Sequence, residues 1–139
     1  MSTVEREFTV PGNDFSRAGE VSGKIKQTLK GLGFSPAAIR RVAIVSYEAE
    51  INMVIHAGGG VAQVNVDDLG IEIILKDEGP GIANIEQAMQ EGFSTAPDNV
   101  RSLGFGAGMG LPNMKRYTDD IQIDSTVGVG TTITMRVNF

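Results

Sequence analysis

Glycine is the residue that most constrains how this chain can fold. The sequence has 18 glycines in 139 residues, about 13% where ~7% is usual. Many of them lie in short clusters, and a cluster interrupts a helix or strand because glycine loses more conformational freedom on folding than other residues. The periodic stretches between the clusters are therefore the candidate helices and strands.

The N-terminal part of the chain predicts a strand followed by a helix. Residues 4–10 (VEREFTV) alternate between apolar and polar side chains, as in a half-buried strand. We expect a polar side chain to cap the helix and Gly33, in a left-handed conformation, to close it. The candidate caps are Asn13, Asp14 and Ser16, and the apolar positions at helical spacing are Phe15, Ala18, Ile25, Leu29 and Leu32.

Residues 37–57 (AAIRRVAIVSYEAEINMVIHA) predict one long, mostly buried helix. Ser35 and Pro36 precede it, which is the usual order of a capping residue and a first helical residue. The run Gly58-Gly59-Gly60 ends the helix.

The rest of the chain predicts two hairpins and two shorter helices. Their strands lie at residues 61–67, 71–76, 121–126 and 131–137, and the helices at residues 84–91 and 111–117. Residues 92–110 lack sustained periodicity, and a loop of that length in a compact domain is either functional or disordered. The total of about five strands and four helices favours a single α+β domain over residues 1–139, with the helices on one face of a sheet.

Composition excludes several classes of function. The net charge is −5, with 12 Lys and Arg against 17 Asp and Glu, so we expect no nucleic-acid partner. Without cysteine there is no disulfide or thiol chemistry, and a single histidine cannot build a multi-histidine metal site. No run of 18 apolar residues and no signal pattern is present, so we expect a cytoplasmic protein without a membrane partner.

A polar stripe crosses the long helix. Glu48, Asn52 and His56 recur every four residues, so they lie on one helical face. Burying such a stripe is costly unless something pairs with it. It is either a structural, hydrogen-bonded feature or a face that presents a carboxylate and an amide to a ligand or metal, and the stripe alone does not distinguish these.

Two glycine motifs follow. Residues 77–82 (DEGPGI) place a carboxylate at a strand end, before glycines that let a ligand approach the backbone, although such a segment alone is more often an ordinary turn. Residues 104–111 (GFGAGMGL) lead into a helix, as a phosphate cradle does. No Gly-Lys-Ser/Thr follows, which excludes a Walker loop, and the motif does not open an N-terminal βαβ unit, which disfavours a dinucleotide fold.

The three motifs in this order resemble the ATP-binding domain shared by histidine kinases, gyrase-type topoisomerases, Hsp90-type chaperones and the mismatch-repair protein MutL, the Bergerat or GHKL fold. The resemblance implies a sandwich with an about five-stranded, mixed, mainly antiparallel sheet. Over residues 5–137 the chain is most similar to the small bacterial anti-sigma-factor and switch-type serine/threonine kinases. The segments that carry this similarity are SYEAEINMVIHAG (46–58), KDEGPGI (76–82), EGFSTA (91–96) and GMGLPNMKRYTDDIQIDSTVGVGTTI (108–133).

The resemblance implies a role for each matching residue. Glu48 matches the catalytic glutamate, which takes a proton from a serine or threonine hydroxyl or from water. Asn52 matches the magnesium-ligating asparagine, and Asp77 matches the aspartate that accepts a hydrogen bond from the adenine amino group. The other implied cofactor-binding positions are Gly79, Gly81, Ile82, Arg101, Gly106, Gly108, Gly110 and Leu111. We expect Glu50 to point elsewhere, since it lies two residues (~200°) from both Glu48 and Asn52.

The implied cofactors are ATP and Mg²⁺, and the implied substrate is a STAS-domain antagonist protein. The other implied partner is a sigma factor or an activating phosphatase, and a homodimer is left open. One alternative is a non-catalytic, nucleotide-gated interaction module, which has no need of a carboxylate such as Glu48 beside the magnesium ligand. The other is a fragment of a sensor histidine kinase, which is disfavoured because no helical hairpin with a histidine precedes the domain.

Overall fold

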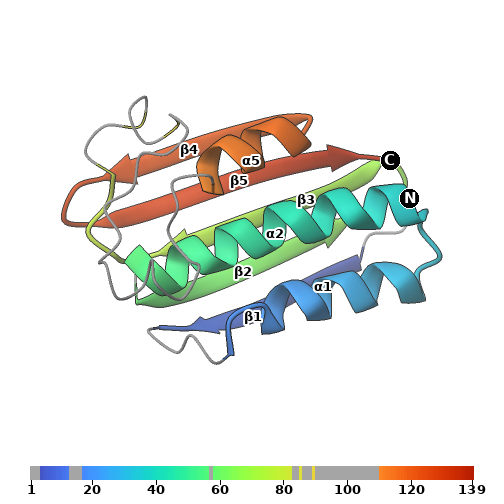
Figure 1. The fold of residues 1–139 in the computed structure, drawn as a ribbon, viewed down its shortest axis with the longest axis horizontal. Helices are drawn as coiled ribbons and strands as arrows, with labels where there is room; N and C mark the ends of the chain where they lie inside the picture. Colours follow the sequence, from blue (N-terminus) through green and yellow to red (C-terminus); the bar gives the residue numbers. More distant parts are fainter. Residues whose placement is uncertain (1–3, 13–16, 57, 83–84, 86–88, 90–109) are drawn as a thin grey trace.

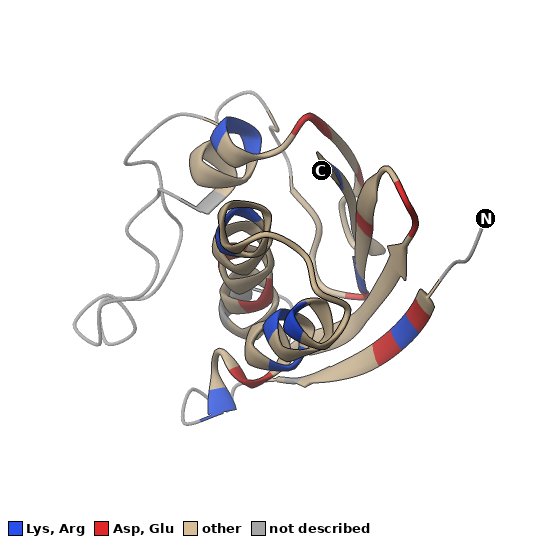
Figure 2. Cartoon of the chain, turned by 90° about the vertical axis from the view of Figure 1, so that its right-hand side faces the viewer, with Lys and Arg blue, Asp and Glu red and all other residues tan. Residues whose placement is uncertain are grey.

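The computed structural model describes residues 4–12, 17–56, 58–82, 85, 89 and 110–139. In these parts, three helices cover one face of a five-stranded sheet (Figure 1). The strands are β1 (Val4–Pro11), β2 (Gly59–Val66), β3 (Gly70–Asp77), β4 (Asp120–Thr126) and β5 (Gly130–Asn138), and the helices are α1 (Glu20–Gly31), α2 (Pro36–His56) and α5 (Gly110–Tyr117). Figure 2 shows the helix layer and the sheet from the side. The expected α+β fold, with helices on one face, is confirmed.

The strands lie in the order β1-β2-β3-β5-β4, and all four pairings are antiparallel. Over its described strands the sheet is thus antiparallel throughout, where the sequence predicted a mixed, mainly antiparallel one. Both predicted hairpins form, β2 with β3 and β4 with β5. The second hairpin inserts β5 next to β3, which places Thr131 opposite Asp77.

Most predicted segments form close to their expected ends. Helix α2 begins at Pro36, and the Ser35 hydroxyl accepts a hydrogen bond from the Ala38 amide (3.3 Å), as expected of a cap. Strand β2 starts two residues earlier than predicted, at Gly59, inside the glycine run that ends α2. The predicted helix at residues 84–91 lies mostly outside the described residues.

The start of α1 differs from the prediction. The helix begins at Glu20, its N-cap is Gly19 at φ 93°, and no neighbouring side chain caps it. The buried Glu50 carboxylate of α2 does so instead, accepting hydrogen bonds from the amides of Gly19, Val21 and Ser22 (3.1, 3.2 and 2.9 Å). The expected cap from Asn13, Asp14 or Ser16 is therefore wrong for α1, and these three lie outside the described residues.

The end of α1 matches the prediction. Gly33 has φ 82°, and the Phe34 amide donates to the Leu29 carbonyl (3.3 Å), which closes a Schellman motif. Of the predicted apolar positions, Ile25 and Leu29 are buried, whereas Leu32 at the C-cap is 43% exposed. Ala18 precedes the helix, and Phe15 lies outside the described residues.

The hydrophobic core lies between the helix layer and the sheet. Helix α2 is central in that layer, between α1 and α5 (Figure 1), so it is apolar on most of its circumference. Burying a large apolar side chain stabilises the fold by about 1.5–3 kcal/mol. The buried residues include Val42, Val45, Ala49 and Met53 of α2 and Val64, Ile73, Met135 and Val137 of the sheet.

Candidate functional site

Asp77 ends β3 and is held in place through one carboxylate oxygen. Its Oδ1 accepts hydrogen bonds from the amides of Gly79 (2.9 Å) and Thr131 (3.2 Å). Its Oδ2 accepts no hydrogen bond from a described residue. The half-buried side chain is thus oriented by the backbone through Oδ1, and the described residues leave Oδ2 without a donor.

The segment after Asp77 is anchored to the β4–β5 hairpin. The Gly128 amide donates to the Pro80 carbonyl (2.9 Å), and the Ile82 amide donates to the Ser125 hydroxyl (2.7 Å). Gly81 has φ 79°, and a Cβ on it would lie 2.5 Å from the Thr126 carbonyl oxygen. Only glycine fits there, because both the conformation and the close approach exclude a side chain.

Ser125 and Thr131 connect this segment to Asp77. Their hydroxyls lie 2.8 Å apart, and Thr131 is also the residue whose amide reaches the Asp77 carboxylate. Asp77, the Ile82 amide and the end of β4 are therefore parts of one hydrogen-bonded group. Figure 1 shows the end of β3, the β4–β5 turn and the C-terminal end of α2 at the same end of the molecule.

Glu48 and Asn52 lie one turn apart on α2, and both are half-buried. The Asn113 amide of α5 donates to Glu48 Oε1 at 3.4 Å, so this face of α2 is turned toward α5. Burial raises the pKa of the Glu48 carboxyl, and the hydrogen bond from Asn113 opposes that rise. A carboxylate with a raised pKa is suited to accepting a proton near neutral pH.

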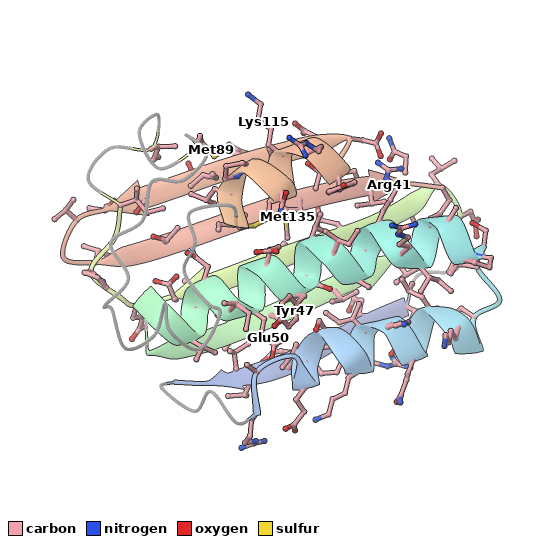
Figure 3. All side chains as sticks on the ribbon, in the orientation of Figure 1. Arg41, Tyr47, Glu50, Met89, Lys115 and Met135 are labelled. Atoms are coloured by element: carbon pink, nitrogen blue, oxygen red, sulfur yellow. The ribbon has the colours of Figure 1, made fainter. Side chains whose placement is uncertain are left out.

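Helix α5 begins at Gly110, the last glycine of the motif at residues 104–111. Leu111 is 7% exposed and belongs to the hydrophobic core, which accounts for its apolar side chain without a ligand. Lys115 is exposed and points away from the core in Figure 3. The N-terminal end of α5 is thus held in place by its own packing.

The described residues contain no group of three or more His, Cys, Asp or Glu side chains that could hold a metal ion. A metal caged wholly by protein is therefore not indicated in this part of the chain. A single amide ligand such as Asn52 remains compatible with Mg²⁺, which usually keeps waters and phosphate oxygens in its shell.

Among the described residues, none of the helices is long and apolar enough to span a membrane.

Residues 37–139 match the family model of histidine kinase-, DNA gyrase B- and HSP90-like ATPases. The chain belongs to this ATPase family. It is 33% identical over 114 residues to the serine/threonine-protein kinase RsbT of Bacillus subtilis, covering 78% of each chain. It is 37% identical over 101 residues to the anti-sigma F factor of Bacillus licheniformis, covering 68% of this chain and 66% of that one. The resemblance seen in the sequence is confirmed.

A solved structure shares the fold of this ATPase family member. A chain from the crystal structure of the SiaB–SiaC complex of Pseudomonas aeruginosa aligns with a TM-score of 0.58 and 11% sequence identity. The alignment covers 96% of this chain and 89% of the other. At this identity the likeness shows the fold alone.

The structure describes most, but not all, of the residues that the ATPase family resemblance singled out. Asp77, Gly79, Gly81 and Ile82 form one hydrogen-bonded segment, and Glu48 and Asn52 share a face of α2. Arg101, Gly106 and Gly108 lie outside the described residues, as does the side chain of His56. The ligand-binding roles of the whole set stay predictions.

Sequence reasoning missed three polar residues that position this site: Asn113, Ser125 and Thr131. All three lie in segments that the family resemblance covered, but no role was assigned to them. The available signal was a polar residue in α5 or near a strand end, in segments that hold several other polar residues. It was weak, because the partners lie 43–65 residues away along the chain.

Proposed function

We propose that this chain is an ATP- and Mg²⁺-dependent protein serine/threonine kinase, acting in the cytoplasm as an anti-sigma-factor or partner-switching regulator. The observation that carries the proposal is the pair Glu48 and Asn52, one turn apart on α2, with Glu48 half-buried and hydrogen-bonded by Asn113. A module that only binds nucleotide has no need of a partly desolvated carboxylate beside a metal ligand. The names of the two relatives, a serine/threonine-protein kinase and an anti-sigma factor, agree with this function.

The residues after β3 fit an adenine base. Asp77 Oδ2 is open to the amino group of adenine, while Oδ1 is held by two backbone amides. Gly81 lets this segment pack closely on the backbone of the β4–β5 hairpin, which fixes the position of the segment relative to Asp77. Asp77, Gly79, Gly81 and Ile82 would hold the base, and Asn52 would bind Mg²⁺. We propose that the phosphates lie by Arg101, Gly106, Gly108, Gly110 and the backbone of Leu111, whose side chain packs in the core.

Bound ATP would supply the phosphoryl group, and Mg²⁺ would neutralise part of the negative charge on the phosphate oxygens. Glu48 accepts the proton of the attacking serine or threonine hydroxyl, so that the new oxygen–phosphorus bond forms as ADP leaves. Asn113 holds the Glu48 carboxylate in orientation through its 3.4 Å hydrogen bond. The raised pKa of Glu48 makes it a stronger base than an exposed glutamate.

The proposed substrate is a STAS-domain antagonist protein, and the proposed second partner is a sigma factor or an activating phosphatase. Incubation with labelled ATP and the STAS-domain protein encoded nearest in the genome tests the function. Label on a serine or threonine of that protein is the expected result. Binding of the STAS-domain protein without transfer of label would contradict the kinase function and favour a nucleotide-gated interaction module.

Asp77→Asn should weaken ATP binding by roughly ten- to a hundredfold. The substitution keeps an oxygen for the two backbone amides, but it replaces a charged acceptor, whose hydrogen bonds are worth about 1.5–3 kcal/mol, by a neutral group. Calorimetric titration with ATP measures the change. Asp68→Asn, at an exposed turn residue at the other end of β3, is the matched control and should bind ATP normally. Equal affinity in both variants would overturn the adenine assignment.

Asn113→Ala should raise the pH at which the rate of phosphoryl transfer falls on the acidic side of its pH profile. The variant removes the hydrogen bond that lowers the pKa of Glu48 and leaves burial, which raises it, unopposed. Transfer rates measured across the acidic to neutral range report the shift. If Asn113 only contributed to packing, the variant would have a lower melting temperature and an unchanged pH dependence of the transfer rate.

A further inference from the structure

A groove of about 870 Å³ lies between α1 and α2. The two helices run side by side in front of the sheet in Figure 1, and Figure 3 shows Tyr47 between them. The groove is separate from the proposed nucleotide site, because Glu48 and Asn113 meet on the other flank of α2.

Helix α2 contributes an apolar stripe to the floor of the groove. Its members recur at intervals of three, four and one residues, so they occupy one helical face: Pro36, Ile39, Ala43, Ile44 and Tyr47. Tyr47 is 38% exposed and Ile44 is half-buried, so the described residues leave this floor partly open. From Pro36 to Tyr47 the stripe runs about 17 Å, or three helical turns.

Helix α1 forms the opposite wall, and small residues open it at the Tyr47 end. These are Gly19, Ser22 and Gly23. A Cβ added to Gly23 would meet no described atom within 4 Å outside its own helix. The described residues thus leave room here for side chains of another molecule.

The rim of the groove is basic. Lys26 and Lys30 of α1 and Arg40 of α2 line it, and the described lining residues include no Asp or Glu. The chain as a whole carries a net charge of −5. A positive rim on an acidic protein attracts a negatively charged partner here and repels it elsewhere on the surface.

We propose that the α1–α2 groove binds an acidic amphipathic helix of a partner protein. A helix fits because the apolar floor is straight, three turns long and bordered by a second helix, as in other helix-in-groove complexes. The apolar face of the guest helix lies on the α2 stripe, and its acidic flanks lie against Lys26, Lys30 and Arg40. The groove is thus a second docking site, which a partner can occupy while the nucleotide site is in use.

A synthetic peptide tests the proposal without nucleotide, so its result does not depend on kinase activity. The probe has about 18 residues, longer than the ~12–15 below which isolated helices are marginal, with Leu at alternating spacings of three and four and Glu on both flanks. A control peptide carries Lys in place of Glu. Fluorescence anisotropy should show binding of the Glu peptide that weakens with added salt, and no comparable binding of the Lys peptide.

Two glycines of α1 provide a matched pair of variants. Gly23 lines the groove and Gly31 is not among the residues that line it, and a Cβ on either meets open space. Gly23→Leu should fill the groove and weaken peptide binding by about tenfold or more, while Gly31→Leu should change it by less than about twofold. Both variants should melt at or above the wild-type temperature, since both positions lie within α1 and leucine has a higher helix propensity than glycine.

A charge pair completes the test. Lys26→Glu should weaken binding of the Glu peptide, whereas Lys76→Glu, the same change on the opposite face of the sheet, should not. Equal weakening by both variants of either pair, or binding of the Lys peptide, would overturn the proposal. So would sedimentation showing a dimer of this chain that Gly23→Leu dissociates, because the occupant would then be a second copy.

Discussion

Glu48→Gln should lower phosphoryl transfer to the partner serine by about 10²–10⁴-fold, while ATP affinity changes little. Glutamine keeps the size of the side chain and an oxygen for the Asn113 amide, which lies 3.4 Å from Oε1. It cannot accept the proton of the attacking hydroxyl. Transfer of label to the STAS-domain protein and calorimetric ATP affinity, measured on the same sample, separate chemistry from binding.

The same variant should not lose stability. Burial raises the pKa of Glu48 above its ordinary value of 4.5. A carboxyl with a raised folded-state pKa contributes stability that is present below the unfolded pKa and is lost as the pH rises through the folded one. At a pH above the folded-state pKa of Glu48, the wild type has lost this contribution, whereas glutamine is uncharged throughout. Above that pKa, Glu48→Gln should therefore melt at or above the wild-type temperature, and the difference should narrow as the pH falls below 4.5.

Asn52→Ala is the comparison for Glu48→Gln. It removes the proposed metal ligand one turn away, so both Mg²⁺-dependent ATP binding and transfer should fall. A Glu48→Gln protein with normal melting, normal ATP affinity and a wild-type transfer rate would contradict the catalytic role. A lowered melting temperature in that variant would instead indicate a structural role for Glu48.

Glu50→Ala should destabilise the fold by about 3–5 kcal/mol, the largest loss of stability that we expect from a single substitution here. Glu50 is 1% exposed, and its carboxylate accepts three backbone hydrogen bonds at the start of α1. Alanine leaves these amides without an acceptor. It also creates a cavity between α1 and α2. The melting temperature should fall by roughly 10 °C or more.

Glu20→Ala is the matched control for Glu50→Ala. Glu20 lies in the first turn of the same helix, but it is exposed and pairs with Arg17 (3.0 Å) and Lys24 (3.4 Å). Arg17 is the main cause that lowers its pKa to about 2. Exposed ion pairs contribute little, so Glu20→Ala should melt close to the wild type. Similar melting temperatures for both variants would contradict the capping role of Glu50.

The start of α1 shows why local sequence did not predict every element. A polar residue just before a helix is the usual cap, which pointed to Asn13, Asp14 or Ser16. The acceptor is Glu50, 28–31 residues away along the chain. Because α1 and α2 pack against each other, a buried carboxylate of one helix reaches the amides of the other, and nothing in the local pattern records this contact. The expectation that Glu50 points away from Glu48 and Asn52 is confirmed.

Local periodicity and breakers determined the helices and strands themselves, since alternation, helical spacing and glycine conformations act within a few residues. Motif order determined the family, and with it the predicted roles of Glu48, Asn52 and Asp77. Only the tertiary structure decided that β5 lies between β3 and β4, which brings Thr131 opposite Asp77. Only the tertiary structure also shows the hydrogen bonds between Ser125 and Ile82 and between Asn113 and Glu48. The physical reason is that such hydrogen bonds join residues distant in sequence, so they exist only once the sheet order and helix packing are set.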